Sequence, residues 1–505
     1  MEPESHDAHI TAVQQKDTSS YRSIFKATSL FGGVQVYQIL IGIVKSKFIA
    51  ILLGPAGMGI MGLYQSTLDV IKSLTAFGLE QSAVRDISEA NGSGDIVRIG
   101  RTYSIVKRLV WTTGLLGLIA AIVFSPLLSQ WTFGNNDYTW GFIILSSTLL
   151  LNQICAGQRV LLQGMRRLKD LAKASAIGST FGLVVSIPLY YWIGVDGIVP
   201  TMVLISVTAL LLSWFYSKKV PIENVQVRTK DALKEGSSML KMGIAMSVSS
   251  ILVAISSYIL RWFIRQQGGV DEVGLFSAGF LITNTYVGMV FTAMGTDYYP
   301  RLASVNKDND KCAEIINQQG EIAVLIIAPI IMSCIIFMPL IIRLIYSEDF
   351  LAANNYVMFA VFGMLFKAAS FVISYVFLAK AESKLFVINE TLCNLYTLLF
   401  YIVGYYIGGL TGLGIAFAVG YIAYLIQVFF VSHCRYNFRF SKTFVMVFTC
   451  QLLFILVGIA IVLILSSFWS YLLSAIVLLS CSAYSLLELE KRVHYMSYLK
   501  NRRIL

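Results

Sequence analysis

The sequence predicts an all-α polytopic membrane protein with about 14 transmembrane helices, in which two parallel six-helix lobes surround a central cavity and two further helices follow. Three observations lead to this fold class. Of 505 residues, 56% are hydrophobic and 13% are charged, and the mean hydropathy is +0.71. Soluble domains carry about 25% charged residues. The second observation is a series of apolar segments, and the third is an internal repeat.

Fourteen segments of the chain are long and apolar enough to cross a hydrocarbon core of roughly 30 Å, which takes about 20 residues of helix. Their centres lie near residues 40, 68, 117, 150, 184, 207, 251, 285, 332, 364, 396, 421, 454 and 476. The first 23 residues are polar and include no apolar core with a cleavage site. They therefore predict a cytoplasmic tail and not a signal peptide.

The two halves of the chain resemble each other at a distance of about 215 residues. The matched positions are mostly glycines and charges: Lys47–Ala50, Gly54 and Gly59 match Arg261–Ile264, Gly268 and Gly274 with one residue inserted; Gly78, Glu80 and Arg85 match Gly295, Asp297 and Arg301; Gly194 and Gly197 match Gly409 and Gly412. Chance matches do not hold so constant an offset across six helices. A repeat that restarts on the same side of the membrane is a parallel one, and such repeats are characteristic of secondary transporters.

We divide the chain into a cytoplasmic N-terminal tail (1–23), an N-lobe with helices 1–6 (24–220), a cytoplasmic linker (221–236), a C-lobe with helices 7–12 (237–433), two extra C-terminal helices (442–487) and a cytoplasmic tail (488–505). Lys and Arg follow every even-numbered segment, whereas the opposite loops are short, rich in Gly and neutral or acidic. By the positive-inside rule, both termini are expected to face the cytoplasm. The rule also accounts for the net charge of +11, so nucleic acid is not an expected partner.

Several function classes are excluded by the motifs that the sequence lacks. It contains no GxxxxGK[ST] motif and no long soluble stretch, so ATP hydrolysis by this chain is not expected. The seven Cys are scattered without a CxxC pair, which favours neither disulfides nor a metal site. We expect no cofactor and no catalytic residues. The chain is predicted to be a secondary transporter and not an enzyme, driven by an ion gradient, the membrane potential or the substrate itself.

Charged residues inside membrane helices are costly, so each is a candidate functional residue unless it lies near a helix end and can reach the interface. The cationic candidates are Lys45, Lys47, Lys72, Arg261 and Lys367. Arg261 has no acidic neighbour within one turn of sequence, and its guanidinium fork suits phosphate oxygens. Together these residues predict a cationic substrate-binding cavity. Arg265 and Arg343 lie near outer helix ends, where snorkelling explains them.

Polar side chains on the first two segments add to this cavity. Gln65, Asp69, Lys72, Ala76 and Glu80 follow a spacing of three to four residues, which places the polar members on one helix face. This stripe either lines the cavity in a coupling role or holds a neutralised pair of Asp69 and Lys72 packed between helices.

The first segment leaves two lysines as alternatives. Gln38 and Lys45 share a helix face, whereas Lys47 points almost the opposite way. Helical phase favours Lys45 for the cavity, and the repeat register favours Lys47 as the counterpart of Arg261.

Two acid and arginine sets occupy equivalent repeat positions near the predicted cytoplasmic ends of helices 2 and 8. They are Glu80 with Arg85 and Asp297 with Arg301, and they predict the salt bridges of a gate. The four His lie in the tails or at the cytoplasmic edge, so a His proton relay is not expected.

The stretch Lys47–Gly59, followed by Gly62–Gln65 and by Leu162–Arg167, resembles the polysaccharide flippases of the O-antigen and enterobacterial-common-antigen (lipid III) type. These belong to the multidrug, oligosaccharidyl-lipid and polysaccharide exporter superfamily. The resemblance covers residues 22–435 and implies alternating access, with transfer of an undecaprenyl-pyrophosphate-linked oligosaccharide from the cytoplasmic to the outer leaflet of a bacterial inner membrane. It also implies membrane lipids and a polysaccharide polymerase machinery as partners.

Two alternative functions remain open. Many relatives look like twelve-helix proteins, whereas this chain has two more predicted helices, as the related lipid II flippases do. A lipid II flippase, which moves a peptidoglycan precursor, is therefore one alternative. A drug and cation antiporter of the same superfamily is the other. An antiporter needs acidic residues to dominate the cavity, and the excess of Lys and Arg on helices 1, 2 and 7 argues against it.

Overall fold

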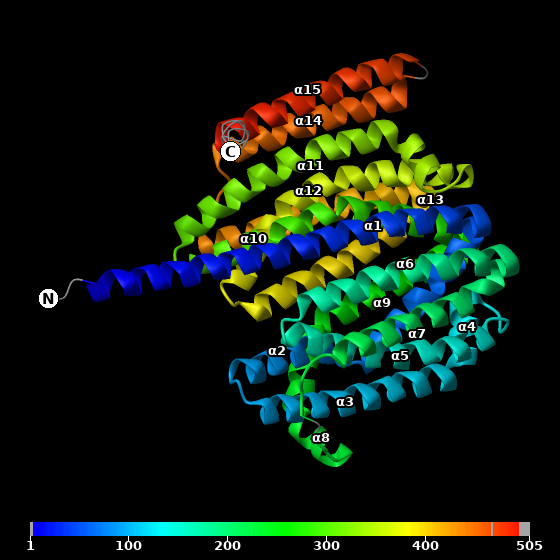
Figure 1. Cartoon of the computed structure of the whole chain (residues 1–505). Helices are drawn as coiled ribbons and strands as arrows, with labels where there is room; N and C mark the ends of the chain where they lie inside the picture. Colours follow the sequence, from blue (N-terminus) through cyan, green and yellow to red (C-terminus); the bar gives the residue numbers. More distant parts are fainter. Residues whose placement is uncertain (1–3, 224, 466–467, 494–505) are drawn as a thin grey trace. The chain divides into compact units, whose positions relative to one another are not determined.

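The structure is a computed structural model that describes residues 4–223, 225–465 and 468–493, without the side chains of residues 4–32, 245, 292, 293, 296, 297, 468 and 493. Within these ranges every regular element is a helix (Figure 1), which confirms the predicted all-α polytopic fold. Ten stretches of the described chain are long and apolar enough to cross a membrane: Gly33–Thr75, Ile96–Val123, Thr139–Gly164, Leu168–Ser217, Met246–Phe291, Asn309–Ile345, Glu348–Ala379, Ser383–Tyr436, Lys442–Ile464 and Trp469–Arg492.

These ten stretches contain all 14 predicted segment centres. Six stretches hold one centre each. The other four have 43, 50, 46 and 54 residues, which is about twice the 20 residues that one crossing takes, and each holds two centres. They are the stretches in which the chain must break and cross a second time.

Glycines at positive φ interrupt the four long stretches. They are Gly54 (φ 64°) in α1 (Glu4–Thr75), Gly194 (φ 65°) after α6 (Leu168–Ile193), Gly269 (φ 83°) in α9 (Ser237–Phe280) and Gly409 (φ 56°) in α13 (Ser383–Tyr436). Side chains of L residues rarely adopt this conformation, so glycine is required at such a break. The first and third breaks are 215 residues apart, and so are the second and fourth.

The break positions correct one detail of the repeat register. The sequence matched Gly54 with Gly268 and needed an inserted residue, whereas the backbone places the second break at Gly269. Two adjacent glycines are equivalent in sequence, and only the backbone shows which one has positive φ. With the offset fixed at 215, Arg261 falls on Ser46, between the two candidate lysines of α1.

The arms of α13 form an antiparallel hairpin about its break. Gln427 Nε2 donates to Asn389 Oδ1 at 2.7 Å, and the Tyr424 hydroxyl donates to Glu390 Oε1. Nearer the break, a Cβ added to Gly404 would lie 2.6 Å from the carbonyl oxygen of Gly412. The closer a pair of contacting residues lies to Gly409, the fewer residues separate its two members along the chain, as antiparallel pairing requires.

The two halves of the chain also share a helix cap. Asp95 accepts hydrogen bonds from the backbone N–H groups of Val97 and Arg98 at the start of α3 (Ile96–Val123). Asp308 does the same for Asp310 and Lys311 at the start of α11 (Asn309–Ile345). A side-chain oxygen at this position satisfies N–H groups that have no partner within the helix.

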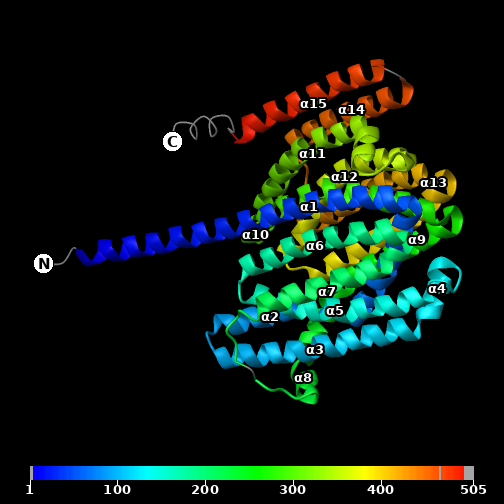
Figure 2. The same ribbon diagram turned by 45° about the vertical axis from the view of Figure 1, so that its right-hand side comes forward.

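The chain divides into two compact units. Unit 1 comprises Tyr64–Ile251 and the chain before Gly54, and unit 2 comprises Gly54–Leu63 and the chain from Leu252 onward. The remaining helices of unit 1 are α2 (Leu79–Gly92), α4 (Ser125–Phe133), α5 (Thr139–Gly164), the short 3-10 helix η1 (Gly194–Gly197), α7 (Ile198–Ser217) and α8 (Thr229–Glu235). In both views α6 and α7 lie side by side (Figure 2).

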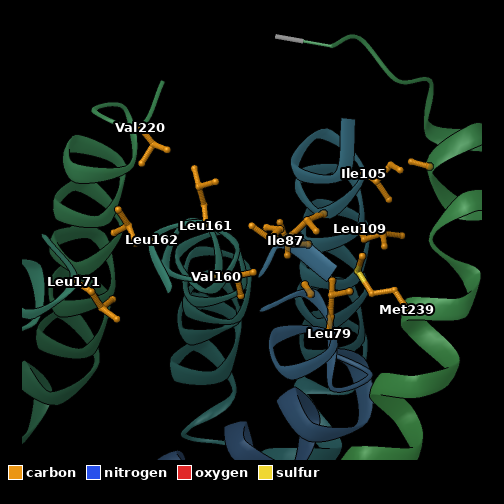
Figure 3. Close-up of a cluster of buried hydrophobic side chains, with 14 of the residues drawn as sticks. Leu79, Ile87, Ile105, Leu109, Val160, Leu161, Leu162, Leu171, Val220 and Met239 are labelled. Atoms are coloured by element: carbon orange, nitrogen blue, oxygen red, sulfur yellow. The ribbon is translucent and has the colours of Figure 1, made fainter. Parts of the chain in front are cut away.

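A buried apolar cluster holds the predicted linker on unit 1. Figure 3 shows Ile87 of α2, Leu109 of α3, Val160 of α5 and Met239 of α9 converging from different helices. Val227 and other apolar residues of 220–239 belong to the same cluster, so the linker is packed and not a free tether. Burial of apolar surface at about 25 cal/mol per Å² stabilises this arrangement.

Unit 2 contains the second part of α9, the π-helix η2 (Leu281–Val287), α10 (Met289–Ser304), α11, the 3-10 helix η3 (Glu348–Ala353), α12 (Asn354–Ala379), α13, α14 (Lys442–Ile464) and α15 (Phe468–Val493). The last two helices pack on each other and on α11 (Figure 1). Arg492 of α15 reaches Glu321 of α11 at 2.7 Å and also contacts Glu488. The two extra helices are thus fastened to unit 2 by an ion cluster.

Candidate functional site

Lys367 lies at the midpoint of α12, in unit 2. Its ammonium donates to Asn284 Oδ1 at 3.3 Å and lies 5.1 Å from the ring centroid of Tyr421. Asn284 belongs to η2, and π-helical turns inside helices are frequent at functional sites. The sequence predicted Lys367 as a cationic candidate, and the structure surrounds it with polar and aromatic partners.

Lys367 lines a pocket that lies wholly within unit 2 and has a volume of about 470 Å³. Small-ligand pockets have volumes of roughly 300–1,000 Å³. The wall is formed by α9, η2, α12 and both arms of α13. Its polar members are Ser256, Ser257, Asn284, Lys367, Ser370, Ser374, Tyr375, Glu390, Cys393, Asn394, Thr397, Tyr401, Tyr421 and Tyr424.

Glu390 is a charged lining residue that the sequence analysis missed. It is half-buried on the first arm of α13, accepts a hydrogen bond from the Tyr424 hydroxyl, and lies close enough to Lys367 to interact electrostatically. The signal was present, because an acid inside an apolar segment is a functional candidate by the same rule that selected the lysines. The sequence could not bring Glu390 and Lys367 together.

Arg261 stands beside this pocket on α9. Its guanidinium donates to the hydroxyl of Ser257 and, at 3.3 Å, to the Ser257 carbonyl oxygen. The guanidinium carbon lies 5.3 Å from the ring centroid of Phe276 and 5.5 Å from that of Phe280. Ser257, Phe276 and Phe280 all line the pocket. The cation–π contacts orient the guanidinium against these walls.

The polar stripe of the second α1 arm lies in unit 1. Gln65, Asp69 and Lys72 are all exposed, and Gln65 Nε2 donates to Asp69 Oδ1 at 3.0 Å. The structure therefore places these three on one exposed face, as the spacing predicted. A row of charged and amide groups on a membrane helix needs water or polar partners, because lipid cannot satisfy them.

The two alternative lysines lie at opposite edges of a buried stripe in the first arm of α1. Ser46, Ile49 and Leu53 are buried, and Lys45, Lys47 and Gln38 are all half-buried. Lys45 precedes Ser46 and Lys47 follows it, so each lies about 100° from the centre of the stripe, in opposite senses. The repeat offset selects neither of them, because it places Arg261 on Ser46.

The predicted gate residues have different surroundings. In unit 1, Glu80 is half-buried, and Arg85 is exposed and contacts the sulfur of Met242 at 2.6 Å. In unit 2, Arg301 is exposed, and the side chain of Asp297 lies outside the described residues. The gate salt bridges therefore remain a prediction.

Arg85 also lines a second pocket, which lies in unit 1 and has a volume of about 460 Å³. Its walls are highly charged. Arg101 of α3 donates to both carboxylate oxygens of Glu235 in α8, at 2.7 and 3.0 Å. This bidentate contact lowers the pKa of Glu235. Burial raises the pKa of Asp86 in the same pocket, against the opposing effect of Arg85. The described residues contain no group of three His, Cys, Asp or Glu that could hold a metal ion.

Solved structures with a similar fold are membrane transporters. An inward-facing multidrug resistance transporter of the MATE family and MOP superfamily matches with a TM-score of 0.67 and 16% identity, over 79% of this chain and 94% of that chain. The lipid II flippase MurJ in an inward closed conformation matches with a TM-score of 0.64 and 13% identity, over 92% of this chain and 99% of that chain. The chain thus has the fold of these transporters, and its ten long apolar helices in the described residues indicate a multi-pass membrane protein.

The family follows from the sequence. Residues 48–355 match the family described as polysaccharide biosynthesis protein, and this chain belongs to that family. The chain is also 21% identical over 414 residues to the lipid III flippase of Escherichia coli (strain K12), a match that covers 80% of this chain and 96% of that protein. The lipid III flippase of Shigella flexneri matches to the same extent.

Proposed function

We propose that this protein is a flippase that moves an undecaprenyl-pyrophosphate-linked oligosaccharide, of the O-antigen repeat-unit kind, from the cytoplasmic to the outer leaflet of the bacterial inner membrane. Family membership and the names of the curated relatives support the class of substrate. The mechanism is alternating access with both termini in the cytoplasm, coupled to the membrane potential or an ion gradient. The polymerase machinery that extends the polysaccharide is the expected next partner.

The observation that carries the proposal is the setting of Arg261. Its guanidinium is held in the membrane span by Ser257 and by two phenylalanine rings, beside a pocket that contains Lys367. A cation in a membrane helix is costly and is therefore a functional candidate by default. A pyrophosphate is a suitable ligand, because it accepts two parallel hydrogen bonds from one guanidinium. Lys45, Lys47 and Lys72 are further proposed cationic contacts, with Gln38, Gln65 and Asp69 as polar neighbours.

The test compares variants of two arginines on the same helix. Arg261→Ala should weaken binding of undecaprenyl-pyrophosphate-linked sugar to the purified protein in nanodiscs by about 10- to 150-fold, because one charge-assisted contact contributes about 1.5–3 kcal/mol. Arg261→Lys keeps the charge but loses the fork, so an intermediate loss is expected. Arg265→Ala removes the same charge one helical turn further along. This variant should bind the lipid-linked sugar as tightly as the wild type does. Equal losses for Arg261→Ala and Arg265→Ala contradict the assignment.

A second candidate substrate is lipid II. The MurJ match extends over 92% of this chain, against 79% for the multidrug transporter, and the chain carries the additional helices α14 and α15. Lipid II has the same polyprenyl-pyrophosphate group, so the Arg261 test does not separate the two. Competition between lipid II and an O-antigen lipid for binding in the nanodiscs does, and the proposal predicts tighter binding of the O-antigen lipid.

A further inference from the structure

The pocket of unit 2 has a composition that differs from what either end of a polyprenyl pyrophosphate requires. Its lining includes one cation, Lys367, and one carboxylate, Glu390, so the charges of the two balance. A pyrophosphate needs excess positive charge, which this wall does not provide. A polyprenyl tail would cover Lys367 and Glu390 with hydrocarbon, and covering polar groups without hydrogen bonds costs several kcal/mol.

A cationic ligand is opposed by Lys367 itself. Its ammonium lies between Asn284 of η2 and the ring of Tyr421, and it interacts favourably with the carboxylate of Glu390. The positive charge that a cationic drug would bring to Glu390 is therefore already supplied by the protein. A neutral ligand that both donates and accepts hydrogen bonds is the remaining class.

The polar groups of the pocket offer both donors and acceptors. The Tyr424 hydroxyl donates a hydrogen bond to Oε1 of Glu390, and Oε2 takes no part in that bond. Asn394 donates its side-chain N–H to the backbone carbonyl oxygen of Glu390 at 2.8 Å, which leaves Oδ1 as an acceptor. Lys367 has three N–H groups, of which Asn284 takes one. Carboxylate, amide and ammonium groups in one wall match adjacent hydroxyls, which act as donor and acceptor at once.

Aromatic rings form much of the remaining wall. Tyr401 and Phe417 stack across the two arms of α13 with centroids 6.3 Å apart and an interplanar angle of 13°, and Tyr421 lies 4.9 Å from Phe417. Phe371 and Tyr375 form a second pair at 4.6 Å. Ring faces carry negative charge density. The C–H groups on the face of a sugar ring carry slight positive charge, so sugars stack on such faces.

We infer that this pocket, between η2, α12 and α13, is a carbohydrate subsite that binds a neutral sugar ring of the transported lipid, with Glu390, Asn394 and Lys367 as its hydrogen-bonding groups. The inference rests on the proposed function and adds to it the part of the substrate that unit 2 recognises. Sugar recognition is then separate from pyrophosphate recognition by Arg261.

The test uses two lipids that differ only in the sugar. Proteoliposomes containing the full chain are supplied with undecaprenyl pyrophosphate, or with the same lipid carrying one neutral sugar from a panel of glucose, galactose, rhamnose and N-acetylglucosamine. Glu390→Gln and Asn394→Ala should each lower the preference for the best sugar-bearing lipid at least tenfold and leave the rate for the sugar-free lipid unchanged. Leu395→Ala, next to Asn394 but 58% exposed and outside the pocket lining, should behave as the wild type.

A second measurement does not depend on transport. Saturation-transfer NMR with the free sugars of the panel should show contact with the wild type and with Leu395→Ala, and no contact with Asn394→Ala. If the wild type moves neither lipid but still binds a sugar through Asn394, the proposed function fails and the subsite stands. If Glu390→Gln and Asn394→Ala each slow transport of the sugar-bearing and the sugar-free lipid equally, the subsite is refuted. It is also refuted if no sugar of the panel contacts the wild type.

Discussion

The ion cluster at the end of α15 sets a clear expectation for stability. Arg492 is 18% exposed and contacts Glu321 and Glu488, whose side chains are 10% and 9% exposed. Removing one partner of a buried pair costs about 3–5 kcal/mol, because an uncompensated buried charge remains. In Arg492→Ala, Glu488 keeps Lys491 at 2.7 Å and Glu321 keeps the Ser441 hydroxyl at 3.2 Å. We therefore expect a loss at the lower end, about 3 kcal/mol.

The expected loss of stability corresponds to a measurable shift of the thermal unfolding midpoint. For domains of 150–250 residues, 1 kcal/mol moves the unfolding midpoint by about 2–4 °C, and unit 2 is slightly larger, so about 6 °C is expected for Arg492→Ala. Thermal unfolding in detergent can be followed with a dye that reacts with free thiols, because Cys312 on α11 and Cys481 on α15 are buried in the folded protein.

The matched control for Arg492 is another arginine of an ion pair that involves α11. Arg343 is 55% exposed and contacts Glu348, which is 80% exposed, at 3.5 Å. Such surface pairs contribute about 0–1 kcal/mol, so Arg343→Ala should change the midpoint by no more than about 2 °C. If Arg492→Ala and Arg343→Ala shift the midpoint equally, the cluster does not fasten α15 to α11 and the reasoning is wrong.

Two further predictions concern the linker and the helix breaks. Because Arg101 lowers the pKa of Glu235, their contact stabilises the docked linker above the ordinary Glu pKa of about 4.3 and is lost as the pH falls below that value through the lowered pKa. Hydrogen exchange of residues 227–236 should rise relative to α5 between about pH 5 and about pH 3 in the wild type; a similar rise in Glu235→Gln refutes this. Gly269→Ala should cost about 1–3 kcal/mol through backbone strain alone, since no atom lies within 4 Å of an added Cβ. Its control is Gly42→Ala, also in open space but without positive φ, and equal thermal midpoints for the two variants exclude strain at the break.

Much of the fold could be predicted from the sequence because lipid imposes simple rules. Segment length and hydropathy located all 14 centres, and the repeat matched, to within one residue, the glycines at which the structure breaks the long stretches. The uncertainty at Gly268 and Gly269 arose because two neighbouring glycines are chemically identical. Backbone φ, which depends on the packing around the turn, separates them.

The candidate site was only partly predictable. The α-helical period placed Gln65, Asp69 and Lys72 on one face, and the structure shows that face exposed. The surroundings of Lys367 depend on η2 and on the pairing of the two α13 arms, neither of which follows from periodicity. The contact of Glu321 with Arg492 joins residues 171 positions apart, and no local pattern signals it.

The most direct test of the proposed function is transport by the wild-type protein in proteoliposomes. Undecaprenyl-pyrophosphate-linked oligosaccharide, lipid II and a cationic dye are supplied in turn, and appearance of each in the opposite leaflet or lumen is measured with a membrane-impermeant reagent. We predict that the O-antigen type of lipid crosses fastest, that lipid II crosses more slowly and that the dye does not cross. Transport of the dye without transport of either lipid would contradict the account and assign the protein to the antiporters.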